Sequence, residues 1–213
     1  DFQSENEGRE WVQQYESMLK NQNAGFLDLD AYEYVIYHYV NQNEPLKARV
    51  ACELAMETYP YSSELLLDYA HVLANCGEND TALEVVKKAE HFFPYDIDLI
   101  VLKCTLMNFE GRNAEVIHYL TGLEPIVEQK DRLYHALATT FFQMEKPQDA
   151  IYWYKKSLDL VPSSPECLEE FVICLNAEER LTESLGYYKK ALDINPFDAL
   201  LWLSYANVLN TIE

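Results

Sequence analysis

The sequence predicts an all-α fold in which antiparallel helix pairs stack into one solenoid. The first observation is a fixed spacing, since Pro162 and Pro196 lie 34 residues apart, as do Ala150 and Ser184. A period of this size is typical of proteins built from stacked repeats. The second is residues 131–164, which form two amphipathic stretches joined by a short turn. The third is composition, because 6 glycines and 8 prolines among 213 residues argue against a turn-rich sheet protein or a disordered chain.

Residues 1–28 precede the clear repeats. One face of a predicted helix in this segment is formed by apolar side chains at helical spacing, namely Trp11, Val12, Tyr15, Met18 and Leu19. A turn signal follows at Asn21 to Gly25. We expect a capping helix and a linker before the first repeat. A remnant of an upstream repeat is the alternative, although the small residues expected of one are absent.

Five repeats and a half repeat follow, at residues 29–62, 63–96, 97–130, 131–164, 165–198 and 199–213. In each unit small residues fall where helix backbones must approach, and large apolar residues fill the spaces between them. Prolines such as Pro60 and Pro94 end the second helix of a unit, because a proline cannot continue a helix. Asp131, Ser164 and Asp198 are placed to cap first helices.

On these residues the chain resembles the tetratricopeptide repeat (TPR) proteins. The second repeat carries the fullest match, with Leu66, Tyr69, Ala70, Leu73, Gly77, Ala82, Val86, Ala89 and Pro94. The resemblance covers residues 29–213. It implies a right-handed α-solenoid, a superhelix whose concave groove is lined by the first helices and holds an extended peptide or a partner helix.

The third repeat departs from this pattern. Lys103 stands where the other repeats place an apolar residue, and Pro125 comes three residues before the expected closing position, Glu128. A lysine on a packing face can carry its charged end to water, but it loses burial. We therefore expect the third repeat to be the weak junction of the array.

The formal net charge of −20 limits the kinds of partner. DNA and RNA binding relies on clustered Lys and Arg, so no nucleic acid is expected, and an anionic membrane surface is disfavoured for the same reason. Solubility of a large surface is one interpretation of the charge. The other is electrostatic attraction of a basic protein partner.

Membrane insertion is not expected, because no apolar run approaches the roughly 18 residues of a membrane span. No signal peptide is visible either, so we expect a cytoplasmic protein. The chain begins at Asp1 rather than at a methionine, and a removed signal therefore stays an open alternative.

The five cysteines are odd in number and lack CxxC spacing, which predicts neither a zinc site nor a disulfide framework. Cys52 and Cys104 occupy positions where the repeat needs a small buried residue, so we expect packing thiols there. The histidines are scattered and form no HExxH pair, and the chain has no glycine-rich phosphate loop and no GxSxG turn. The sequence thus predicts no enzyme, no metal and no cofactor.

The resemblance assigns the groove to one face of the first helices. The candidate groove residues are Tyr34, Tyr37, Asp68, His71, Thr105, Asn108, Arg132, His135, Thr139, Phe142 and Glu170. Surface hydrogen bonds are the plainer interpretation of His71 and His135. The adjacent carboxylates Glu169 and Glu170 point in different directions on a helix, so we interpret them as a solvated face.

Some TPR proteins that bind chaperone tails use Lys, Arg and Asn at these positions to clamp a terminal carboxylate. Among the equivalent residues here only Arg132 is positive, so no such clamp is expected. An acidic groove with exposed aromatic rings suits a protein partner that has Lys or Arg beside apolar anchors.

The predicted function is a protein–protein interaction module or scaffold. One alternative is a self-assembling structural unit, a homo-oligomer that docks through the half repeat at 199–213. The observation behind this alternative is that Trp202, Val208 and Leu209 do not form the polar outer face expected of a terminal repeat. The other alternative is a regulatory domain of a larger protein.

Overall fold

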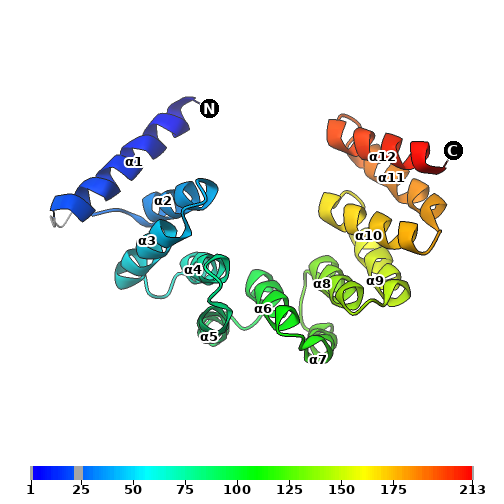
Figure 1. Cartoon of the computed structure of the whole chain (residues 1–213), viewed down its shortest axis with the longest axis horizontal. Helices are drawn as coiled ribbons and strands as arrows, with labels where there is room; N and C mark the ends of the chain where they lie inside the picture. The colour runs from blue at the N-terminus through cyan, green and yellow to red at the C-terminus, as the bar shows by residue number, and fades with distance from the viewer. Residues whose placement is uncertain (1, 22–25, 213) are drawn as a thin grey trace. The chain divides into compact units, whose positions relative to one another are not determined.

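The computed structural model describes residues 2–21 and 26–212, and over these residues it has twelve α-helices, one short 3-10 helix and no strand (Figure 1). The helices are α1 (Phe2–Asn21), α2 (Leu29–Asn41), α3 (Pro45–Thr58), α4 (Ser63–Asn75), α5 (Asn79–Glu90), α6 (Ile97–Phe109), α7 (Asn113–Leu123), α8 (Lys130–Gln143), α9 (Pro147–Leu160), α10 (Pro165–Ala177), η1 (Leu181–Glu183), α11 (Ser184–Ile194) and α12 (Ala199–Ile212). The predicted all-α helical-repeat solenoid is confirmed. Most of the turn predicted at Asn21 to Gly25 lies outside the described residues.

The repeat is visible in the backbone as well as in the helix order. The turn between the helices of a pair contains one residue with a positive φ, and these residues are spaced by 34: Asn43, Gly77, Gly111, Glu145 and Glu179. Only two of them are glycine, which adopts this left-handed conformation without a steric penalty. The other three are exposed, and the backbone N–H of each donates to the carbonyl three residues before it.

The chain divides into two compact units, Asp1–Leu106 and Met107–Glu213, so the division falls inside α6. In unit 1, α3 presents the fully buried alanines Ala48, Ala51 and Ala55 to its neighbours. Small side chains at these positions let the helix backbones approach closely. The predicted burial of Cys52 and Cys104 is confirmed, and burial raises the pKa of the Cys104 thiol to about 12.

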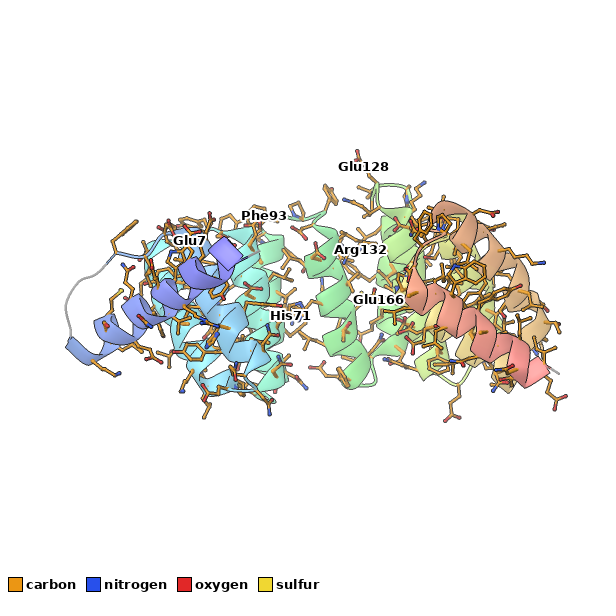
Figure 2. All side chains as sticks on the ribbon, turned by 90° about the horizontal axis from the view of Figure 1, so that it is seen from above. Glu7, His71, Phe93, Glu128, Arg132 and Glu166 are labelled. Carbon is orange, nitrogen blue, oxygen red and sulfur yellow. The ribbon has the colours of Figure 1, made fainter. Side chains whose placement is uncertain are left out.

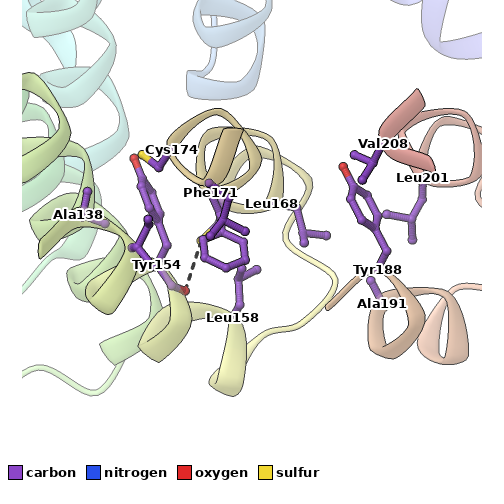
Figure 3. Packing of buried hydrophobic residues seen from close by; sticks show 14 of the residues in the cluster. Ala138, Tyr154, Leu158, Leu168, Phe171, Cys174, Tyr188, Ala191, Leu201 and Val208 are labelled. Carbon is purple, nitrogen blue, oxygen red and sulfur yellow. Dashed lines mark hydrogen bonds between the residues drawn. The ribbon is translucent and has the colours of Figure 1, made fainter. Parts of the chain in front are cut away.

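Unit 2 has a core of large side chains from α8 to α12. Tyr154 of α9 and Phe171 of α10 are fully buried, with ring centroids 6.5 Å apart, and Figure 3 shows Phe171 beside Leu158 and Leu168. Tyr187 packs edge-on against Phe171 at 5.0 Å. Such aromatic pairs add to the stabilisation that burial provides.

Of the three predicted helix caps, Asp198 and Ser164 stand at the expected position and Asp131 does not. Asp198 accepts hydrogen bonds from the backbone N–H groups of Leu200 and Leu201, both at 3.0 Å. Asp131 was predicted to cap α8, which is wrong, because the helix already begins at Lys130 and Asp131 lies in its first turn. Ser164 precedes α10 but its side chain makes no capping hydrogen bond.

Lys103 is buried more deeply than its charge suggests. Its Nζ lies 2.8 Å from Oε2 of Glu90, and the two side chains are only 16% and 17% exposed. The charged end of this lysine is therefore held by Glu90 rather than carried to water. The packing face accepts the lysine because α5 supplies a carboxylate for it, and breaking such a half-buried pair is costly.

Candidate functional site

Unit 2 presents a stripe of polar and aromatic side chains along one face of α8. Arg132, His135, Thr139 and Phe142 are spaced by three or four residues, so they follow one another along the helix surface. Figure 2 shows Arg132 on the α8 ribbon. Phe142 is 37% exposed, whereas the other three are half-buried. Four of the eleven predicted groove residues thus share one helix face.

Glu170 of α10 joins this stripe. One of its oxygens, Oε2, lies 2.9 Å from Nε2 of His135, 2.9 Å from Oγ1 of Thr139 and 2.8 Å from the hydroxyl of Tyr154. Burial alone would raise the pKa of this carboxyl, but hydrogen bonds from His135, Tyr154 and Thr139 lower it below its ordinary value. The interpretation of Glu170 as a solvated residue is therefore wrong, because the side chain folds back onto α8 and α9. Glu169 is exposed, as expected.

Replacing Glu170 by glutamine should destabilise unit 2 by about 1–2 kcal/mol near neutral pH, because an ionised acceptor is lost and the site is partly open to solvent. The folded-state pKa of Glu170 is lowered, so its stabilisation is present above the ordinary pKa and is lost as the pH falls through the folded-state value. Urea unfolding at about pH 6 and at about pH 3 should show the difference shrinking with acid. Glu169→Gln is the matched control, and an equal effect there would contradict the assignment.

A hollow of about 550 Å³ opens on α10, α11 and α12. Its lining combines apolar and polar side chains: Ser163, Pro165, Leu168, Glu169, Val172, Ile173, Asn176, Leu181, Tyr188, Asp198, Leu200, Leu201, Ser204, Asn207, Val208 and Thr211. Helices α10 and α12 are the first helices of consecutive repeats. The hollow therefore involves two helices of the kind to which the resemblance assigns binding.

None of the eleven predicted groove residues lines this hollow. Val208, expected on an outer face, is instead buried at it. The signal that could have revealed the hollow is α12 itself, since Ala199–Ile212 contains no charged residue in a strongly acidic chain. An exposed helix surface without charged residues is typical of an interaction site rather than of a surface that contacts only water.

The predicted groove residues of unit 1 share fewer direct contacts than those of the stripe on α8. Tyr37 of α2 is 64% exposed, and His71 of α4, which Figure 2 labels, is exposed as well. Burial raises the pKa of Asp68, and so does the negative charge of Glu64. The pKa of Glu33 is raised by burial, by Asp68 and by other neighbouring acids. Several carboxyl groups of unit 1 therefore lie near one another on α2 and α4.

Tyr34 is covered by α1 rather than left open. The rings of Trp11 and Tyr34 meet edge-on at 5.6 Å, and Gly8 lies so close to the Tyr34 ring that no side chain could be added there. The N-terminal helix therefore occupies the place on α2 where a partner would have to reach Tyr34.

Thr105 and Asn108 of α6 have different surroundings. Thr105 is exposed and its hydroxyl donates to the Val101 carbonyl within the same helix, at 3.0 Å. The amide of Asn108 donates to the hydroxyl of Thr140 at 2.9 Å, and Thr140 is fully buried. Asn108 is thus bound to α8 within unit 2.

Among the residues that the structure describes, no group of three His, Cys, Asp or Glu side chains could hold a metal ion. None of the helices in the described part of the chain is both long and apolar enough to cross a membrane.

Solved structures with a similar fold are TPR proteins. A thermophilic TPR protein of Thermus thermophilus is 19% identical, with a TM-score of 0.65, and the match covers 84% of this chain and 98% of that one. PilF of Pseudomonas aeruginosa is 22% identical, with a TM-score of 0.60, over 77% and 75% of the two chains. One chain of the Cut9–Hcn1 hetero-tetramer is 16% identical, with a TM-score of 0.63, over 97% of this chain and 41% of that one.

No protein-family model matches the chain, and no curated protein matches it in sequence. The structural matches, together with the helix pairs and their spacing, define the class: an all-α helical-repeat protein. Within this class the fold is similar to that of tetratricopeptide repeat proteins.

Proposed function

We propose that the chain is a protein–protein interaction module that binds a segment of a partner on the face of its first helices. The observation that carries this proposal is the hollow on α10 and α12. Its volume of about 550 Å³ lies within the range of ligand sites, and its lining combines an apolar surface with polar groups that can orient a ligand. The Cut9–Hcn1 hetero-tetramer shows that a protein of similar fold assembles with a different chain.

Further support comes from the exposed aromatic rings on first helices. Tyr37 and Phe142 present large apolar surfaces of the kind that anchor protein interfaces. In this proposal residues 1–28 cap the array, and Tyr37, Asp68 and His71 offer an acidic and aromatic contact surface. All five cysteines are free thiols, which fits a reducing compartment such as the cytoplasm.

Ser204→Trp should abolish partner binding at the hollow, because Ser204 is exposed in its lining and an indole there takes the place of a bound segment. Ala206→Trp is the matched control, since Ala206 is exposed on the same helix but does not line the hollow. Capture of a partner on immobilised protein, followed by cross-linking and mass spectrometry, measures the difference.

A partner that is cross-linked to α10 or α12, lost with Ser204→Trp and kept with Ala206→Trp would support the proposal. Capture that both variants retain would contradict it. Circular dichroism of each variant confirms that the helices are intact, so loss of binding is not mistaken for loss of fold.

A second candidate function is self-assembly through α12. The observation that favours it is the exposure of apolar side chains on this charge-free helix, with Leu203 59% exposed and Trp202 49%. Two such faces could pair without repulsion between like charges. Sedimentation of the unchanged chain and of Ala206→Trp tests this candidate. A molecular mass that rises with protein concentration, and that rises less in Ala206→Trp, would favour self-assembly.

A further inference from the structure

The hollow in unit 2 has an apolar floor. Leu168 comes from α10, Leu201 and Val208 come from α12, and all three are buried. Tyr188 of α11 lies beneath them, also buried, and Figure 3 shows its ring facing Val208 and Leu201. A floor of this kind favours aliphatic side chains of a ligand, which leave water when they enter.

The rim of the hollow is negative. Glu169 is exposed and has no ion-pair partner among the described residues, and its charge helps to raise the pKa of Tyr188, which burial already raises. Glu169 and Tyr188 both line the hollow, so the charge of Glu169 lies at this site. The carboxylate of Asp198 lies at the start of α12, where its Oδ1 accepts hydrogen bonds from two backbone N–H groups.

No positive group balances these two acids within the hollow. None of its lining residues is Lys, Arg or His, and the whole chain carries a net charge of −20. A ligand with carboxylates would be repelled here, whereas a ligand with a cation beside apolar side chains would satisfy both the floor and the rim.

We propose that the hollow binds a peptide segment of the partner in which aliphatic side chains stand next to Lys or Arg. The inference rests on the proposed function and adds the chemistry of the ligand. The aliphatic side chains enter between α10 and α12, the cation lies against Glu169, and the amides of Asn176 and Asn207 face the peptide backbone.

Two short peptides, capped at both ends and labelled with a fluorophore, test the charge preference by fluorescence anisotropy. One has the core Leu-Leu-Lys-Leu-Lys, and the other replaces both Lys by Glu. The full chain should bind the lysine peptide at least about tenfold more tightly than the glutamate peptide, and added salt should narrow the gap.

Two charge reversals locate the site. Glu169→Lys should weaken binding of the lysine peptide by about fivefold, because an attraction at the rim becomes a repulsion. Asp193→Lys, which makes the same charge change at an exposed position of α11 outside the hollow, should change the affinity by less than about twofold.

Equal affinity for the two peptides, a preference for the glutamate peptide, or no binding of either would overturn this inference. So would an equal effect of Glu169→Lys and Asp193→Lys, or lysine-peptide binding that Ser204→Trp leaves intact. The proposed function is tested independently of this inference. A partner that the chain captures and that Ser204→Trp no longer captures would support the proposed function even if the peptides show no charge preference.

Discussion

Phe171→Ala should lower the free energy of unfolding of unit 2 by about 3–5 kcal/mol. The ring is 0% exposed and contacts Tyr154 and Tyr187, so its removal leaves a cavity that the surrounding helices cannot fill. Hydrogen exchange measured by mass spectrometry should show faster exchange from α9 to α11. The binding surface would be lost only because its scaffold is lost.

Phe142→Ala is the matched control, since it removes the same side chain from a partly exposed position on α8. It should change stability by less than about 1 kcal/mol. Its expected effect is on partner affinity, if the stripe on α8 is part of the binding face. Equal destabilisation by the two alanine substitutions would contradict the division between core and surface drawn from their burial.

The second large effect concerns the attachment of α1. Tyr15 is 1% exposed, and its ring meets Tyr32 at 6.5 Å and Tyr39 at 6.1 Å. Tyr15→Ala should cost about 3–5 kcal/mol, enough to release α1 from α2 and uncover Tyr34. Hydrogen exchange of α1 should rise to that of an unfolded segment, while α4 and α5 stay protected.

Tyr15→Phe separates the ring from its hydroxyl. This hydroxyl is buried, and it has no hydrogen-bond partner in the part of the chain that the structure describes. Removing it should therefore leave α1 attached and stabilise the protein by up to about 1 kcal/mol. Destabilisation by Tyr15→Phe would show that the hydroxyl is satisfied in solution.

Much of the fold was predictable because its determinants are local. Helical spacing of apolar residues, prolines after second helices and an acidic cap such as Asp198 act over a few positions of the chain. The stripe on α8 followed in the same way, since Arg132, His135 and Thr139 share a face of any helix formed by this segment. Asp131 shows the limit of such reasoning, because a helix that begins two residues earlier turns a cap into a first-turn residue.

The candidate site was less predictable. Glu169 and Glu170 look alike in the sequence, yet one is exposed and the other accepts three hydrogen bonds. Tyr34 looks as available as Tyr37 until α1 is placed upon it. Lys103 looks like a defect until Glu90 is found beside it.

The sequence by itself determined the helix pairs, their 34-residue period and the acidic character of the chain, because these depend on residue type and on neighbours close in the chain. Only the tertiary structure decided which carboxylate is enclosed, which tyrosine is covered and where the surface is hollow. Those features depend on distances between side chains on different helices, and a repeat pattern states which residues face a neighbour without stating how closely they meet.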